Sequence, residues 1–214
     1  MVDLSLICCC YMQEEYVIES WRSAKNQVFK GSMETIIHHD HCSVGMGTGA
    51  SAARNAAISL TSGRRIIIID ADDRLPTNYA QTLWDEMEKH PMSFAGCPVQ
   101  FVSGPTLARF SLPHPGVYSL VDLKDDLPIP VSSMFDRGAW REIDGYSCNW
   151  KACEDTEFWL RMLAAGYSYI HTEKTCLIKH NPPTSKSHQQ IELRKIEAAK
   201  MNALYGCNFQ DEVI

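Results

Sequence analysis

The chain has 214 residues, of which 45% are hydrophobic and 21% charged, a composition typical of a soluble globular protein. Its net charge of −6 disfavours a protein that coats nucleic acid or anionic membrane through bulk positive charge. No apolar run approaches the roughly 20 residues that a membrane-spanning helix needs, and the N-terminus does not resemble a signal peptide. Nine cysteines without zinc-ribbon spacing favour a reducing compartment, so the sequence predicts a cytoplasmic protein.

The first 90 residues alternate between short apolar runs and amphipathic stretches. The apolar runs predict strands at residues 2–9, 33–38 and 64–69. The amphipathic stretches predict helices at residues 13–29, 51–60 and 76–89. This alternation is typical of an α/β layer with parallel strands, whose right-handed crossovers bring the strand ends to one edge.

The second half of the chain is less regular. We expect one strand at residues 93–102, one at 131–135 and one or two at 167–180. We also expect helices at 154–165 and 187–205, and mainly loop at 105–130, which holds five prolines. The apolar face predicted for the last helix consists of Ile191, Ile196, Ala199 and Ala203. Because no repeat, linker or low-complexity tract divides the chain, residues 1–214 are predicted to form one domain.

An acidic cluster follows the most apolar of the predicted strands. Residues 66–69 are four isoleucines, a run typical of a strand buried on both faces of a sheet. Asp70, Asp72 and Asp73 come directly after it, at the strand end where ligands of α/β sheets bind. The Asp-x-Asp spacing places two carboxylates on one side of an extended chain, where they suit Mg²⁺ or Mn²⁺ shared with substrate phosphates. A solvated acidic turn is the alternative.

A glycine-rich loop, Gly45 to Gly49, leads into the second predicted helix. Its N–H groups and the helix N-terminus suit an anion, and Arg54 is either a phosphate or base ligand or a solvated helix residue. Gly45, Gly47 and Ala50 also match a dinucleotide fingerprint, which keeps a nucleotide-dependent oxidoreductase as an alternative function. Against this function, the loop follows the second strand and lacks an acidic residue about 20 positions later.

Two clusters contain histidine. Residues 38–42 hold three histidines, an aspartate and a cysteine, but neighbouring strand residues point to opposite faces and do not converge on one ion. Within this stretch, Asp40 is a candidate contact to a base or ribose. His180 follows the last predicted strand and is either a turn residue or a metal ligand through an imidazole nitrogen.

The predicted helix at 154–165 opens with three acidic residues among four. Acids in a first turn are stabilised by the helix dipole, and Glu157 with Arg161 is an ordinary i,i+4 pair. Asp155 follows an irregular loop, so it is a candidate general base if it reaches an acceptor hydroxyl.

Taken in order, these stretches resemble the family 2 glycosyltransferases of GT-A fold, and the resemblance runs to about residue 187. The similar segments are residues 4–11, 36–40, 53–55 (Ala-Arg-Asn), 69–73 (Ile-Asp-Ala-Asp-Asp), 144–146 (Asp-Gly-Tyr) and 154–155 (Glu-Asp) with Arg161. Each motif occurs by chance, whereas six in the family's order are specific. The departures from the family pattern are Cys9, Met12, His39, His41 and Cys42. The histidines at positions 38, 39 and 41 flank Asp40, where the resemblance places the nucleotide base.

The resemblance implies a Rossmann-like GT-A fold, with a mixed, mostly parallel sheet flanked by helices. It divides the chain into a nucleotide-sugar-binding half at residues 1–90, an acceptor-binding half at 91–186 and a C-terminal helix at 187–206. It implies donor binding by Cys10, Tyr11, Asp40, Arg54, Asp70 and Ala71. It further implies metal ligation by Asp72 and His180, a catalytic base at Asp155, an acceptor side with Gly145, Tyr146 and Glu154, and auxiliary roles for Asp73 and Arg161.

The implied reaction is an inverting transfer of a sugar from a nucleotide diphosphate, with UDP expected, assisted by Mn²⁺ or Mg²⁺. The acceptors that this leaves open are a glycan, a protein and a hydroxymethylated nucleobase in DNA, and no integral membrane segment is expected. A non-catalytic nucleotide-sugar-binding module is the second alternative. The presence of Asp72, Asp155 and His180 together argues against it.

Overall fold

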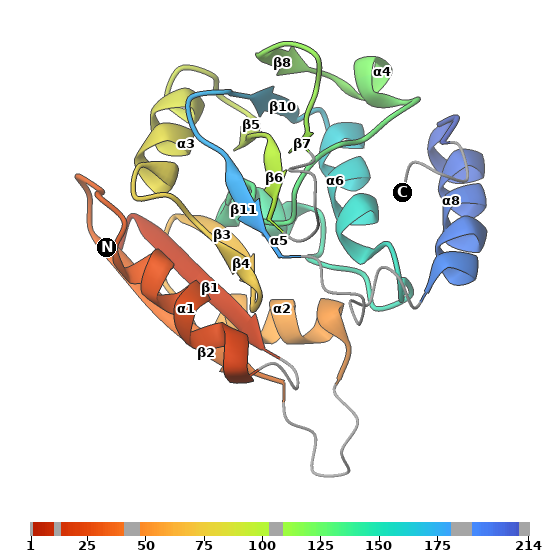
Figure 1. Ribbon diagram of the computed structural model, residues 1–214. Helices are drawn as coiled ribbons and strands as arrows, with labels where there is room; N and C mark the ends of the chain where they lie inside the picture. Colours follow the sequence, from red (N-terminus) through yellow and green to blue (C-terminus); the bar gives the residue numbers. More distant parts are fainter. Residues whose placement is uncertain (1, 11–13, 41–47, 103–108, 181–189, 210–214) are drawn as a thin grey trace.

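A seven-stranded mixed sheet forms the centre of the molecule, in the order β2-β1-β3-β9-β5-β10-β8 (Figure 1). The computed structural model describes residues 2–10, 14–40, 48–102, 109–180 and 190–209. The strands of this sheet are β1 (Leu4–Cys10), β2 (Met33–His39), β3 (Arg65–Asp70), β5 (Ser93–Gly96), β8 (Gly116–Tyr118), β9 (Met134–Asp136) and β10 (Ser168–His171).

Most of these strands run in one direction. β1 is parallel to both β2 and β3, and β5 is parallel to β10. β9 lies between β3 and β5 and is antiparallel to both, so β5 points the same way as β3. β8 is antiparallel to β10. The prediction of a mixed, mostly parallel sheet is therefore confirmed.

The four isoleucines of β3 lie at the centre of the core, as their run predicts. All four are fully buried. Ile67 and Ile69 belong to one apolar cluster, and Ile66 and Ile68 belong to another. Because successive side chains of a strand point to opposite faces, the two clusters lie on opposite faces of the sheet. A polar substitution within this run is therefore expected to disrupt one of the two layers of packing.

Helices cover both faces of the sheet. The cluster with Ile67 contains buried residues of α1 (Glu14–Lys25) and α3 (Tyr79–Met87). The cluster with Ile66 contains buried residues of α2 (Ala50–Ser59) and α6 (Glu154–Ala164). α1 ends four residues before Phe29, the predicted end, and α3 begins three residues after Pro76. None of the helices within the described ranges combines the length and the apolar character that a membrane crossing requires.

Two short helices were not predicted. α4 (Leu120–Leu123) lies in the proline-rich segment and begins with a capping box, in which Ser119 and Asp122 bond to each other's backbone N–H groups. α5 (Arg137–Glu142) directly follows β9. Each has less than two turns, too few for a periodic apolar pattern to develop.

A second, four-stranded sheet brings distant segments to the end of β3. Its order is β4 (Asp73–Arg74), β11 (Leu177–Lys179), β6 (Val99–Phe101) and β7 (Arg109–Phe110). The prediction of a single strand at residues 93–102 is wrong, because β5 and β6 belong to different sheets and Pro98 stands between them. Proline donates no ladder hydrogen bond, which favours a break there.

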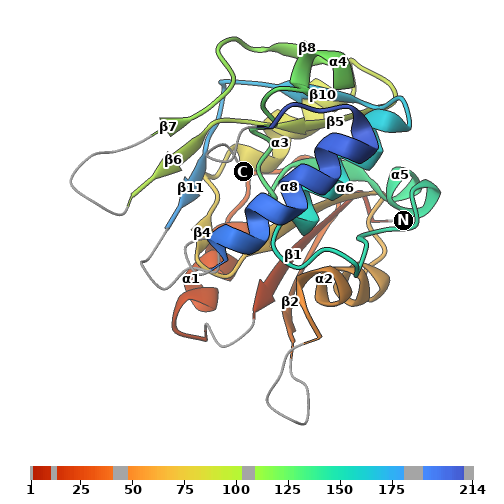
Figure 2. The same ribbon diagram turned by 90° about the vertical axis from the view of Figure 1, so that its right-hand side faces the viewer.

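The C-terminal helix α8 (Ile191–Tyr205) packs against α6 (Figure 2). Its predicted apolar face is wrong. Ile191 and Ile196 are 51% and 54% exposed, and the alanines predicted beside them are exposed too. The buried residues of α8 are instead Glu197, Ala198 and Met201. The helix is oriented by a buried carboxylate, so an apolar pattern alone could not predict its orientation.

Candidate active site

The carboxyl ends of β1, β2 and β3 meet at one edge of the central sheet, as the crossover rule predicts. The parallel register pairs Cys9 with Asp70 and Cys10 with His39. The side chains of Cys10 and Ala71 are buried in the apolar core, so only their main-chain atoms are available to a ligand. Tyr11, His41, Cys42 and the loop at Gly45 and Gly47 lie outside the described residues.

Asp40 lies just past β2 at this edge. Its backbone N–H donates to the carbonyl of Cys10 at 2.9 Å, and its carboxylate accepts hydrogen bonds from the N–H and the hydroxyl of Thr48 at 2.9 and 2.7 Å. Burial opposes ionisation of Asp40, but the hydrogen bonds outweigh it and hold the pKa below its usual value. Asp40 therefore presents an ionised carboxylate.

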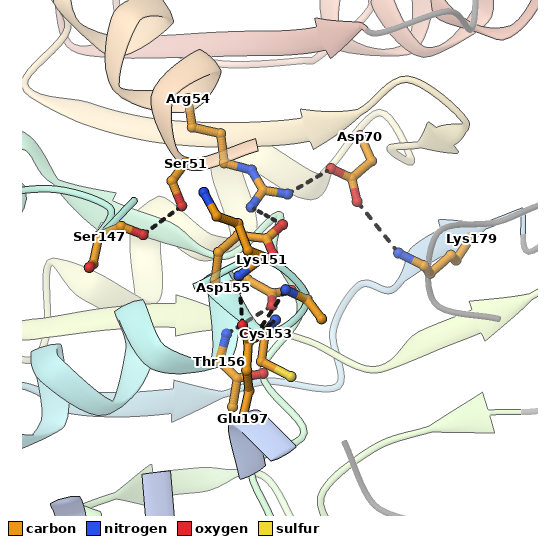
Figure 3. A network of polar contacts seen from close by, with 12 residues as sticks. Ser51, Arg54, Asp70, Ser147, Lys151, Cys153, Asp155, Thr156, Lys179 and Glu197 are labelled. Carbon is orange, nitrogen blue, oxygen red and sulfur yellow. Dashed lines mark hydrogen bonds and ion pairs between the residues drawn. The ribbon is translucent and has the colours of Figure 1, made fainter. Parts of the chain in front are cut away.

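Arg54 connects the strand edge to α6. Its guanidinium is buried, with Nη2 at 3.3 Å from Asp70 Oδ1 and Nη1 at 3.1 Å from Glu154 Oε1 (Figure 3). It also lies over the ring of Tyr146, 5.4 Å from the ring centroid. Burial disfavours its charge, but Asp70 and Glu154 outweigh this effect and raise the pKa of Arg54. Arg54 is therefore a charged buried residue, and the alternative of a solvated helix residue is wrong.

Lys179 supplies a second cation, which sequence reasoning missed. Its Nζ lies 3.6 Å from Asp70 Oδ2 and 3.6 Å from Asp73 Oδ2. The antiparallel pairing of β4 with β11 sets Lys179 directly opposite Asp73, so the contact follows from strand register. Burial raises the pKa of the fully buried Asp73, and Lys179 opposes that rise. Asp70 thus has a cation near each carboxylate oxygen.

Asp72 and His180 flank the paired residues of β4 and β11. The register pairs Arg74 with Ile178 and Asp73 with Lys179, so Asp72 directly precedes β4 and His180 directly follows β11. The charges of Asp72 and Lys179 each shift the pKa of the other group, so Asp72 belongs to the same electrostatic cluster. His180 Nε2 is buried and has no hydrogen-bond partner among the residues that the structure describes.

The protonation of His180 suits a metal ligand. Burial, followed by the charge of Arg74, lowers the pKa of His180, which favours the neutral imidazole that binds metals. Within the described residues, no three His, Cys, Asp or Glu side chains gather into a complete metal site. Mg²⁺ and Mn²⁺ at phosphate sites commonly use one or two protein ligands with substrate oxygens and water. Asp72 and His180 fit that arrangement and do not fit an all-protein cage.

Asp155 lies in the first turn of α6 and is partly buried. Its Oδ1 accepts the N–H of Thr156 at 2.8 Å (Figure 3). Its negative charge contributes to the raised pKa values of Arg54 and Lys179, so it belongs to the same electrostatic cluster. The structure thus brings the candidate base, the neighbouring Glu154 and the aspartates after β3 to one place.

The turn on the acceptor side is held by Asn55. Its Oδ1 accepts hydrogen bonds from Tyr146 N at 2.9 Å and Trp140 Nε1 at 3.1 Å, while its Nδ2 donates to the Tyr146 carbonyl at 2.8 Å. Gly145 has φ of +68°, and a Cβ there would lie 2.7 Å from Asn55 Oδ1. The turn therefore requires glycine at position 145 and asparagine at position 55. The Ala-Arg-Asn and Asp-Gly-Tyr motifs are joined by these contacts.

Two further predicted site residues, Tyr146 and Arg161, make contacts that support the fold. The Tyr146 ring is buried, stacked on Phe158 with 4.0 Å between ring centroids, and supports Arg54 from one side. Arg161 forms a bidentate pair with Glu157 and donates to the carbonyl of Ile143. No contact described for Arg161 reaches the acidic cluster, and its bonds fix the end of α5 against α6.

A comparison with protein-family models finds a match for part of the chain. Residues 44–145 match the family model described as Glycosyl transferase family 2. This segment contains Arg54, the aspartates after β3 and Gly145, whereas Asp155 and His180 lie beyond it. The segment also contains the loop at residues 45–49, so the oxidoreductase alternative is set aside. The search of curated protein sequences found no match.

The fold is similar to that of solved TarS structures. S. aureus TarS superposes with a TM-score of 0.70 at 13% identity, over 98% of this chain and 41% of that chain. TarS 1–349 in complex with UDP-GlcNAc gives 0.72 at 12% identity, over 98% and 68%, and its complex with UDP gives 0.68 at 13%, over 92% and 65%. The chain thus spans 41% of the longer TarS chain and about two thirds of TarS 1–349. Residues 44–145 are thus similar to glycosyl transferase family 2, and the chain has the GT-A fold of the TarS structures.

Proposed function

We propose that the protein transfers a sugar from a UDP-linked donor, such as UDP-GlcNAc, to an acceptor hydroxyl with inversion of configuration. The observation that carries this proposal is an excess of carboxylates at one sheet edge. Two cations, Arg54 and Lys179, face five acids, which are Asp70, Asp72, Asp73, Glu154 and Asp155. Such an imbalance favours binding of a further cation together with an anionic ligand. TarS, which has this fold, is described in complex with UDP and with UDP-GlcNAc.

The donor is expected to lie along the carboxyl ends of β1, β2 and β3. Asp40 presents an ionised carboxylate that can accept the N–H of a uracil ring. Asp70 is held between Arg54 and Lys179, which fixes its orientation toward the nucleotide. These three strand ends give a UDP group hydrogen-bond partners along its length.

Asp72 and His180 are the residues that would hold Mn²⁺ or Mg²⁺ with the donor diphosphate. When bound, the cation supplies positive charge to the leaving diphosphate. Lys179 adds a fixed positive charge beside Asp70 and Asp73.

Asp155 is proposed as the general base. It would accept the proton of the acceptor hydroxyl as the hydroxyl oxygen attacks the anomeric carbon and the bond to the diphosphate breaks. A single displacement of this kind inverts the configuration and needs no covalent intermediate. Glycan, protein and hydroxymethylated DNA all offer such a hydroxyl, and the net charge of −6 disfavours DNA.

Thermal unfolding with UDP, UDP-GlcNAc, other sugar nucleotides and NAD⁺, with and without Mn²⁺, tests the proposal. A ligand that binds only the folded state raises the melting temperature by mass action. We expect a rise with UDP-GlcNAc that is larger with Mn²⁺, no rise with NAD⁺, and loss of the metal-dependent part in Asp72→Asn and His180→Ala. Stabilisation by NAD⁺ alone, or none by any UDP compound, would contradict the proposal.

A further inference from the structure

A buried glutamate on α8 holds the loop that precedes the candidate base. Glu197 is 3% exposed. Its Oε1 accepts the N–H of Lys151 at 2.8 Å, and its Oε2 accepts the N–H groups of Ala152 and Cys153, both at 3.0 Å (Figure 3). Three consecutive N–H groups around one anion form a nest, in which each donor is satisfied by the same charge. Glu197 is therefore the internal anion of the loop at residues 151–153.

This carboxylate replaces a local helix cap. Cys153 is the N-cap of α6, and no side-chain hydrogen bond caps the helix there. Helix N-termini are usually satisfied by a Ser, Thr, Asp or Asn at the N-cap, or by a Glu three residues later that reaches back to the N-cap N–H. Glu197 accepts that same N–H from 44 residues further along the chain. The start of α6 thus depends on a side chain from another helix.

Further contacts hold α8 against α6 at both ends. The Cys153 thiol lies 4.0 Å from the carbonyl oxygen of Arg194, and the Tyr205 hydroxyl donates to Glu157 Oε1 at 3.0 Å. An apolar cluster fills the space between the two helices, with Cys153, Leu160, Met201, Cys207 and Phe209 as its buried members. Because these contacts fix α8, Glu197 is held rigidly against the loop.

We propose that Glu197 is a positioning residue for sugar transfer, which fixes residues 151–153 and, through them, the place of Asp155 in the first turn of α6. This inference rests on the proposed function, in which Asp155 is the base. A carboxylate displaced by about 1 Å from a reacting hydroxyl can lose roughly a hundredfold in rate. Glu197 contacts neither Asp40 nor Lys179 among the bonds described for it, so the donor site is expected to keep its affinity.

The experiment compares Glu197→Gln with Glu192→Gln on the same helix, where the Glu192 side chain is 85% exposed. Glutamine keeps the shape of Glu197 but turns one acceptor oxygen into a donor that opposes the loop N–H groups. The measurements are amide hydrogen exchange across residues 148–156, and the kcat, its pH profile and the KM for release of UDP from UDP-GlcNAc.

For Glu197→Gln we expect exchange at residues 151–153 to rise at least about tenfold and kcat to fall about tenfold or more, with KM changed less than about twofold. The midpoint of the pH profile should also shift, because the base has moved relative to Arg54. Glu192→Gln should change none of these. Unchanged exchange, unchanged kcat, or equal effects in both variants would overturn the proposal.

Two outcomes separate this inference from the function on which it rests. If the unaltered protein releases no UDP from any sugar nucleotide, the proposed function fails, and the exchange data alone decide whether Glu197 holds the loop. If Glu197→Gln does not fold, exchange in the unaltered protein decides. Protection at residues 151–153 equal to that of α6 supports the inference, and rapid exchange there overturns it.

Discussion

The two ends of β3 both bury arginine beside acid, but they differ in charge balance. At the amino end, Arg65 pairs with Glu88 at 2.7 Å and with Asp136 at 3.6 Å, and it lies over the ring of Trp84 at 4.2 Å. Arg137 donates hydrogen bonds of 2.7 to 2.8 Å to two backbone carbonyls and one hydroxyl nearby. The positive charges of Arg65 and Arg137 are thus stabilised by acids, by backbone and hydroxyl oxygens and by the face of the Trp84 ring.

At the carboxyl end, negative charge is in excess. Arg54 and Lys179 neutralise part of the acidic cluster, and Asp72 pairs with neither in the contacts described. Burial and the charge of Asp70 raise the pKa of Asp72, and the charge of Lys179 only partly offsets this rise. The comparison teaches that buried charge alone does not mark a binding site. A better indication of a binding site is an excess of one charge that the protein's own residues do not neutralise.

The largest difference in stability between the two ends of β3 is expected when one buried arginine at each end is replaced. Arg54→Met removes the buried ion pair with Glu154, and we expect the free energy of unfolding to fall by about 3–5 kcal/mol. Arg137→Met removes hydrogen bonds to neutral oxygens and should cost about 2 kcal/mol. Urea unfolding measures both changes.

Donor binding then separates the two variants. Arg54→Met should also lose the thermal stabilisation by UDP-GlcNAc and Mn²⁺, because Arg54 orients Asp70. Arg137→Met should keep that stabilisation in full. If both variants lose it equally, the distinction between a structural and a functional end of β3 is wrong.

A smaller, pH-dependent effect is expected for Lys179→Met. Burial raises the pKa of Asp73 in the folded protein above its usual value of 3.8, so the folded state keeps a proton that the unfolded chain releases. The contribution of Asp73 to the free energy of unfolding therefore falls as the pH rises from its pKa in the unfolded chain to its pKa in the folded protein. Removal of Lys179 raises the folded pKa further and extends that fall to higher pH.

The stability difference between Lys179→Met and the unaltered protein should thus be smallest near pH 4. It should widen toward pH 7 by up to about 1.4 kcal/mol for each pH unit in which Asp73 is protonated in folded Lys179→Met but ionised in the folded unaltered protein. Urea unfolding over this range measures it. A difference that stays constant with pH would show that Lys179 does not control the ionisation of Asp73.

The smallest effect is expected at the exposed pair beside the amino end of β3. Arg64 and Glu88 lie 2.9 Å apart, but both side chains are about half exposed, at 49% and 50%. Exposed pairs contribute little because water screens them, so Arg64→Ala should change the free energy of unfolding by less than about 0.5 kcal/mol. Thermal unfolding at low and high salt checks this value, and a larger salt-dependent loss would contradict it.

The parts of the fold that the sequence predicts are those governed by local pattern. Four consecutive isoleucines are typical of a strand buried on both faces, and the acids that follow them lie at its end. The start of α6 at Glu154 was likewise predictable from acids in a first turn and an apolar face after them.

The missed features depend on contacts between distant segments. Lys179 reaches Asp73 through the register of two short strands about a hundred residues apart, which no local pattern encodes. Glu197 was overlooked because a carboxylate is expected on the solvent face of a helix. It is buried because three N–H groups of a distant loop need an acceptor. A glutamate amid a weak apolar pattern was the available signal, but its partners could not be read from the sequence.

The most direct test of the central claim is Asp155→Asn, assayed by UDP release and by binding of UDP-GlcNAc in the presence of Mn²⁺. Asparagine keeps the shape of the side chain and cannot accept the acceptor proton as a carboxylate does. We predict a fall in turnover of roughly 10²–10⁴-fold with donor affinity nearly unchanged. Full turnover in Asp155→Asn would contradict the assignment of the base.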